Sequence, residues 1–150
     1  MARIDYPSGL SVTYGYDSQG RITSVGSDVG AILNNITYLP FGPVSAWTDG
    51  SGATRTVSYD AGFRITSINM PGLLELSYSL DDADNITALA DDMNAGRNQA
   101  FSYDAVDRLT DAAGGYGTFQ FTFDPVGNRL TEDDDGLLTN TTTAPTTTAC

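Results

Sequence analysis

The chain has 150 residues and a formal net charge of −12, from 19 acidic residues and seven Arg, with no Lys and no His. Without a basic stripe to displace phosphate counterions, nucleic-acid binding and attachment to anionic membranes are excluded. The absence of His removes Ser-His-Asp and Cys-His sites and His-ligated metals. The length suits one domain, or a piece of a larger array.

The composition is that of a strand-and-turn protein. The acidic residues are almost all Asp, and Thr, Ser, Tyr, Gly and Asn are abundant, whereas helix surfaces recruit Glu and Lys. The one cysteine, Cys150, allows no intrachain disulfide, and we interpret it as a truncation scar or tag in preference to an intermolecular link. The sequence shows no signal peptide and no membrane span, so secretion is expected to be directed by sequence outside this chain or by a dedicated apparatus.

The first clear element is a hairpin. Residues 10–17 alternate, with Leu10, Val12, Tyr14 and Tyr16 on one face of a predicted strand. A tight turn at Gln19-Gly20 follows, and Arg21 opens the return strand. The whole unit reads Tyr16-Asp17-Ser18-Gln19-Gly20-Arg21-Ile22-Thr23.

This unit recurs along the chain. Copies begin at residues 16, 38, 59, 80, 103 and 123, a period of about 21 residues that marks a repeat architecture. The copy at 38 has two prolines in its turn, which predicts a bulge or an edge position. The copy at 80 has diverged from the motif, and the copy at 123 is interpreted as carrying one extra residue. The repeat-signature residues are Tyr16, Asp17, Gly20, Arg21, Tyr38, Gly42, Tyr59, Asp60, Arg64, Asp81, Tyr103, Asp104, Arg108, Phe123, Asp124, Gly127 and Arg129.

The segments between these copies also indicate strands. Residues 49–52 form a second turn signal, and Leu74, Leu76, Tyr78 and Leu80 alternate with polar residues. The weakly periodic stretch 88–100 favours a strand and a long loop over a helical turn. The sequence thus predicts six hairpins, about twelve strands and no helix.

The predicted array occupies residues 1–131. From 132 to 150 the chain is first acidic and then rich in Thr, a composition that cannot bury a core and predicts a tail or linker.

The Tyr-Asp-x-x-Gly-Arg-Ile-Thr core over residues 10–131 resembles the YD repeat, also called the RHS repeat. This repeat occurs in bacterial RHS polymorphic toxins, in the shell subunits of insecticidal ABC toxins and in teneurins. The resemblance implies an all-β protein in which antiparallel hairpins stack into a spiral sheet. In the family such a sheet closes into a hollow shell around a C-terminal toxin domain.

Stacking has a physical reason as well. A lone hairpin is marginally stable, so stability must come from the interfaces between neighbouring repeats. We expect Arg21, Arg64, Arg108 and Arg129 to bridge Asp side chains or backbone carbonyls of adjacent hairpins.

Other chemistry was weighed against this interpretation. The acidic stretches 131–136 and 81–85 lack the ligand spacing of an EF-hand and are interpreted as solvated turns, so no metal or cofactor is expected. The Asp124-Pro125 pair resembles the signature of the self-cleaving aspartyl-protease region that follows the repeats in RHS proteins, but it lies in register with a repeat turn. Three Asn-x-Thr sites match the N-glycosylation pattern by composition alone: Asn35, Asn85 and Asn140.

The sequence therefore predicts a structural protein that is not an enzyme. The first hypothesis is a scaffold or shell segment of a large secreted or surface bacterial protein, whose partners are other YD repeats of the same chain or of neighbouring copies. The alternative is a subunit that stacks head to tail into an extracellular fibre, because no capping element is evident at the strand ends. A third hypothesis, a carbohydrate-binding adhesion module, depends on the in-phase tyrosines, for which packing on the apolar face is the stronger interpretation.

Overall fold

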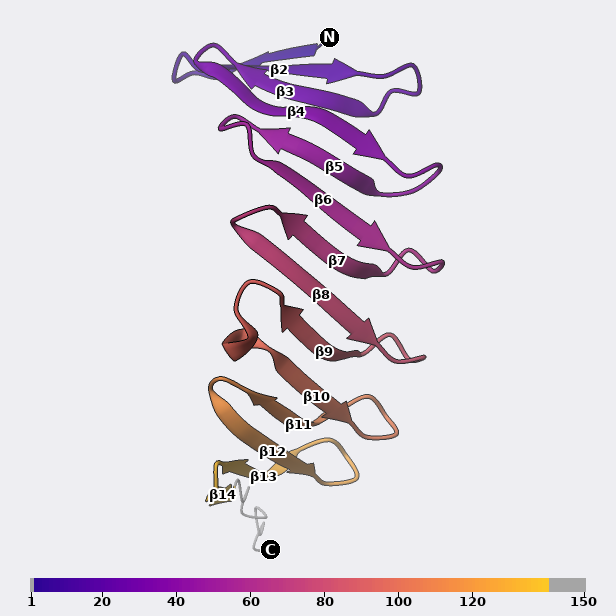
Figure 1. The fold of residues 1–150 in the computed structure, drawn as a ribbon, viewed down its shortest axis with the longest axis vertical. Helices are drawn as coiled ribbons and strands as arrows, with labels where there is room; N and C mark the ends of the chain where they lie inside the picture. Colours follow the sequence, from indigo (N-terminus) through magenta and orange to yellow (C-terminus); the bar gives the residue numbers. More distant parts are fainter. Residues whose placement is uncertain (1, 141–150) are drawn as a thin grey trace, which may run out of the picture. The chain divides into compact units, whose positions relative to one another are not determined.

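The computed structural model describes residues 2–140 (Figure 1). The chain forms two compact units, one ending at Ser77 and one beginning at Tyr78. In each unit the strands are antiparallel, and their order in the sheet is their order in the chain. The predicted class, an all-β protein of antiparallel hairpin repeats, is confirmed.

The first unit contains β1 (Ala2–Asp5), β2 (Ser11–Tyr16), β3 (Ile22–Ser27), β4 (Gly30–Tyr38), β5 (Val44–Asp49), β6 (Thr54–Tyr59), β7 (Ile65–Met70) and the start of β8 (Leu74–Leu80). The second contains the end of β8, then β9 (Ile86–Asp91), a single 3₁₀ turn η1 (Ala95–Arg97), β10 (Gln99–Tyr103), β11 (Leu109–Gly114), β12 (Gly117–Phe123), β13 (Arg129–Asp134) and β14 (Leu137–Asn140).

Every signature turn closes a hairpin in the same way. In the first, the Asp17 N–H donates to the Arg21 carbonyl at 2.9 Å, and the Gly20 N–H donates to the Asp17 carbonyl at 3.1 Å. Gly20 adopts a φ of 79°, in the region that glycine enters without a steric penalty. The same two bonds close the turns that begin at residues 39, 60, 81, 104 and 124. Within each unit these turns follow one another along the same edge of the sheet (Figure 1).

The turn does not depend on glycine at that position. Phe63, Asp84 and Asp107 take the place of Gly20 in their own turns and have φ values of 62°, 71° and 62°. Side chains other than glycine are strained in this region by about 1–2 kcal/mol. The closing bonds are thus kept even where the sequence departs from the motif.

The sixth turn corrects the sequence alignment. Asn128, and not Arg129, occupies the position of the motif arginine, because the Asp124 N–H donates to the Asn128 carbonyl. Phe123 is paired across the strands with Arg129, just as Tyr16 is paired with Ile22. The interpretation of an extra residue in this copy is therefore wrong, and Arg129 takes the place of the motif isoleucine.

The sheet also contains more strands than predicted. β1 precedes the first signature hairpin, and β14 follows the last, so the described residues contain fourteen strands. The acidic run from Glu132 to Asp134 is part of β13, and the sheet continues to Asn140, whereas the predicted array ends at 131. A strand tolerates these acids because each has a local partner or solvent; the Gly136 N–H, for example, donates to Asp133. Residues 141–150, which include the Thr-rich tract and Cys150, lie outside the described residues.

Two local expectations can be compared with the structure. The stretch 88–100 contains the end of β9 and then η1, so the predicted strand and loop includes one short helical turn. The proline-containing turn was expected to bulge or to lie at an edge, but it closes with the same two bonds as the other turns, between two inner strands. The irregularity of this hairpin lies earlier, in β4, where the register with β5 shifts between Asn34 and Thr37 and Asn35 has a φ of 52°.

Each unit is a single layer of strands, and no α-helix covers either face in residues 2–140. Only three apolar residues in that range are buried: Val12, Val57 and Ala112. No large side chain is fully buried. The in-phase apolar side chains therefore form a half-exposed face and not a closed core.

Candidate functional site

The first candidate site is the clamp inside each signature turn. The Asp17 carboxylate accepts hydrogen bonds from the backbone N–H groups of Gln19 and Arg21, both at 2.9 Å, through Oδ1. Its Oδ2 accepts from Arg21 Nε at 2.8 Å. Because Arg21 comes four residues after Asp17, the carboxylate and the guanidinium lie at the two ends of the same five-residue turn and can bond to each other. The same clamp forms in the turns of Asp60 with Arg64 and of Asp104 with Arg108.

Where the arginine is missing, asparagine takes over part of its role. Asn128 donates to Asp124 Oδ1 through its backbone N–H and to Oδ2 through its side-chain amide, both at 2.8 Å. Asn85 donates to Asp81 in the same two ways. Asp124 belongs to the Asp-Pro pair that resembles a protease signature. Its carboxylate is engaged in the hydrogen bonds of a repeat turn.

These contacts lower the pKa of the clamp carboxyls below the usual value of 3.8. For Asp17, Asp60 and Asp104 the largest cause is the hydrogen bond from the backbone N–H of the arginine in the same turn. For Asp124 it is the hydrogen bond from the Asn128 side chain. The clamp aspartates are therefore ionised and act as hydrogen-bond acceptors. A protonated catalytic carboxyl would need the opposite shift.

The arginines were expected to bridge hairpins, and the structure corrects this for two of them. Arg21 pairs with Asp17 of its own turn and meets the next hairpin only through its guanidinium face, 4.7 Å from the Tyr38 ring centroid. Arg129 pairs with Glu132 of its own strand at 2.8 Å. For both arginines the ion pair therefore lies within one hairpin.

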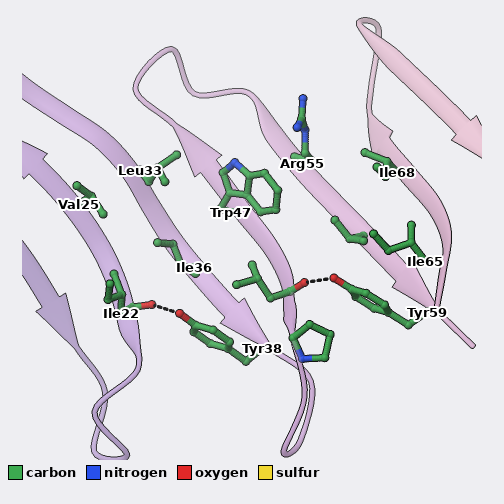
Figure 2. A pocket seen from close by; sticks show the side chains of 13 residues that line it. Ile22, Val25, Leu33, Ile36, Tyr38, Trp47, Arg55, Tyr59, Ile65 and Ile68 are labelled. Atoms are coloured by element: carbon green, nitrogen blue, oxygen red, sulfur yellow. Dashed lines mark hydrogen bonds between the residues drawn. The ribbon is translucent and has the colours of Figure 1, made fainter. Parts of the chain in front are cut away.

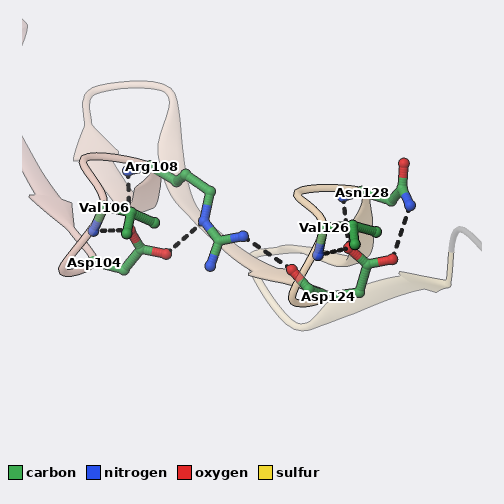
Figure 3. A network of polar contacts seen from close by, with 6 residues as sticks. All are labelled: Asp104, Val106, Arg108, Asp124, Val126 and Asn128. Atoms are coloured by element: carbon green, nitrogen blue, oxygen red, sulfur yellow. Dashed lines mark hydrogen bonds and ion pairs between the residues drawn. The ribbon is translucent and has the colours of Figure 1, made fainter.

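Arg108 does both. Its Nε is bonded to Asp104, and its Nη1 donates to the backbone carbonyl of Asp124 in the next hairpin at 2.9 Å (Figure 3). Its guanidinium also lies 4.8 Å from the Phe123 ring centroid. The expected link to a neighbouring carbonyl is present at this arginine.

The motif tyrosine makes the recurrent link between repeats, which sequence reasoning missed. The hydroxyl of Tyr38 donates to the Ile22 carbonyl and that of Tyr59 to the Val44 carbonyl, each at 2.8 Å (Figure 2). In the second unit the Tyr103 hydroxyl donates to the Ile86 carbonyl at 2.9 Å. In each case the acceptor is the first residue of the return strand in the preceding hairpin. The recurrence of tyrosine at the same position of several copies within the chain is the signal that could have indicated this role.

The second candidate site is a hollow of about 620 Å³ on the apolar face of the first unit (Figure 2). Its lining is contributed by β3 to β7 and is almost wholly hydrocarbon and aromatic ring, with Ile36, Trp47, Tyr59 and Ile68 among its members. Arg55 is the charged residue in this lining. Its guanidinium lies 5.4 Å from the Trp47 ring centroid, and its Nε is buried without a hydrogen-bond partner.

Between residues 2 and 140, no three acidic side chains are arranged to hold a metal ion, the predicted acidic turns included. In the same range, no helix has the length and hydrophobicity to cross a membrane.

Comparison with known proteins identifies the repeat. The RHS Repeat family model matches residues 2–32, which contain β1 to β3 and the first signature turn. The Photorhabdus luminescens Tc holotoxin pore with a mutation in TccC3 is similar in structure, with a TM-score of 0.76 and 18% identity over 89% of this chain and 8% of that chain. The crystal structure of TcdB2-TccC3 is also similar, with a TM-score of 0.77 and 18% identity over 88% of this chain and 9% of that chain.

At this identity the likeness shows a shared fold. This chain spans less than a tenth of the length of the solved chains it matches. No curated protein matches it in sequence.

Proposed function

The chain carries YD-repeat (RHS-repeat) sequence and has the YD-repeat fold, and we propose that it is a non-enzymatic wall segment of a larger scaffold or shell. One observation carries the proposal: the polar groups of the motif are engaged within the sheet. Asp and Arg clamp three of the six turns and Asp and Asn two more, and a Tyr hydroxyl fastens three of the hairpins to the one before. A motif whose donors and acceptors mostly bond to one another is suited to repeat along a sheet and leaves few polar groups for a substrate.

The fold relatives support a wall more than a free-standing module. The matched chains are parts of a Tc holotoxin pore and of a TcdB2-TccC3 complex, and the chain corresponds to a small share of each. A single-layer sheet with one half-exposed apolar face also suits a wall that separates two environments. We extend the proposal to a secreted or surface-exposed bacterial protein in which any toxic activity belongs to another region.

A fibre subunit is the second candidate, because both outer edges of the described sheet are unpaired. β1 is paired with β2 alone and β14 with β13 alone among the described strands. Exposed strand edges template the addition of further strands.

Electron microscopy of the purified chain separates the two functions. A wall segment is expected to give small monodisperse particles at all protein concentrations. Filaments that lengthen as the protein concentration rises would instead support the fibre subunit and contradict the wall segment. As a control, an Arg or Pro in β14 at Leu138, which is 57% exposed, blocks edge growth and abolishes filaments but leaves the monomer folded.

A further inference from the structure

The hollow of the first unit contains an arginine without a hydrogen-bond or ion-pair partner in the described residues. Among the residues that the structure describes, Arg55 makes no hydrogen bond and no ion pair, and its Nε is buried. A buried donor without an acceptor, and a cation without a counter-ion, both cost stability unless something supplies the missing partner. The chain has 19 acidic residues, yet none of those described forms an ion pair with Arg55.

A candidate counter-ion two residues after Trp47 is already engaged. Asp49 ends β5, the strand that contains Trp47, but its Oδ1 accepts from the backbone N–H groups of Ser51 and Ala53 and from the Ser51 hydroxyl. These bonds lower the pKa of Asp49, the Ser51 side chain contributing most. Asp49 is thus held in its own turn. The other arginine on this face, Arg21, is paired with Asp17.

The strand register fixes where the free charge lies. Arg55 and Trp47 are directly paired across β6 and β5, so both side chains are on the same face of the sheet. Stacking on the indole places the guanidinium at one end of the hollow, as Figure 2 shows, with Ile36 and Ile68 on the neighbouring strands. The charge is therefore at the edge of a hydrocarbon surface, where a low dielectric strengthens its attraction for an anion.

We propose that this hollow binds a small apolar carboxylate, a molecule with an ionised acid at one end and a hydrocarbon body. The acid accepts two hydrogen bonds from the Arg55 guanidinium, whose planar fork matches a carboxylate. The body lies on the isoleucine and tyrosine side chains of β4, β6 and β7. An apolar cavity of a few hundred Å³ with a single well-placed polar group is the usual form of a small-molecule site.

The charge and the surface together specify this class of ligand. A short acid such as acetate gains the charge contact but buries no hydrocarbon, whereas an alcohol of equal length buries the same hydrocarbon and leaves Arg55 without its counter-ion. Binding must therefore depend on both parts.

The chain provides its own reporter, because Trp47 is the single tryptophan. Titration with decanoate, below the concentration at which it forms micelles, is expected to change the Trp47 emission in a saturable way with one site per chain. Decanol is expected to bind about tenfold more weakly and acetate not measurably, because a hydrogen-bonded charge is the larger polar contribution. Equal binding of decanoate and decanol would overturn the proposal, and this comparison needs no variant.

Two variants sharpen the test. Arg55→Gln removes the charge but keeps a polar side chain that can donate a hydrogen bond, and it is expected to reduce decanoate affinity about tenfold, with no effect on decanol. Arg97→Gln is the matched control, since Arg97 is exposed in the second unit and pairs at 3.7 Å with Asp91. Undiminished decanoate binding by Arg55→Gln, or equal loss in both variants, would show that the hollow is a non-selective apolar surface.

Discussion

At the scale of single residues, the tyrosine of the motif matters for its hydroxyl as much as for its ring. The ring lies on the half-exposed apolar face, and the hydroxyl reaches a backbone carbonyl of the preceding hairpin. Each acceptor carbonyl lies at the start of its return strand, outside the residue pairs that join this strand to the next hairpin, so the tyrosine hydroxyl supplies a donor where the ladder between hairpins does not reach.

Replacing Tyr59 by Phe tests this role. The change removes the 2.8 Å bond to the Val44 carbonyl and is expected to lower the free energy of unfolding by about 1 kcal/mol. Tyr16→Phe is the matched control, because Tyr16 is 45% exposed and its hydroxyl makes no hydrogen bond in the described residues. Urea unfolding of both variants measures the difference. Equal effects would mean that the hydroxyl is not the fastener.

Residue-scale reasoning from the sequence succeeded where the interaction is local. The clamp depends on Asp and on a donor four residues later, so the spacing alone predicts the hairpin turns at 17, 60 and 104. The same rule would have placed Asn128 correctly, since it is the fourth residue after Asp124. The resemblance of Arg129-Leu130-Thr131 to the motif Arg-Ile-Thr led the alignment away from that spacing.

The contacts that sequence reasoning missed are those between hairpins. Which carbonyl Tyr38 reaches depends on the register between β3 and β4, and that register contains a bulge. The strand β14 was missed for another reason: its partner β13 includes an acidic run, which composition alone assigns to a linker. Neither the bulge nor the pairing of β13 with β14 can be read from local sequence.

At the scale of the element, each turn is a small electrostatic unit that stabilises its hairpin only while its aspartate is ionised. The pKa values of Asp17, Asp60, Asp104 and Asp124 are all lowered from 3.8 in the folded chain. A group whose pKa is lower when folded than when unfolded stabilises the folded state above its unfolded pKa. That contribution is lost as the pH falls through the folded pKa.

The clamp contribution is therefore expected to be constant from neutral pH to about pH 5 and to be lost progressively as the pH falls below about 4, through the lowered pKa of the folded chain. Neutralising the many other acids of the chain acts in the opposite direction by reducing repulsion, so a variant must isolate the clamp. Asp17→Asn keeps the turn acceptor without the charge, and its free energy of unfolding should fall less in acid than that of the wild type. Parallel pH profiles would show that the Asp17 carboxylate contributes nothing through its charge.

At the scale of the whole molecule, residues 2–140 form no closed core in either unit, and the stability of the chain is a sum of local terms. Turn clamps, cross-strand ladders and tyrosine links each join a residue to its own hairpin or to the next one. Such arrays are stabilised by neighbour interfaces and not by long-range packing. The apolar face that remains half-exposed is consistent with a segment that works beside other surfaces of a larger wall.

This architecture has a calorimetric consequence. The heat capacity of unfolding rises with the apolar surface that unfolding exposes, about 12–15 cal/mol/K per residue in ordinary domains. Since only Val12, Val57 and Ala112 are buried apolar residues in the described range, the purified chain is expected to give a distinctly lower value per residue in scanning calorimetry. A value within the ordinary range would mean that the apolar face is covered in solution by a second copy. In that case the melting temperature would also rise with protein concentration, because association stabilises the folded state by mass action.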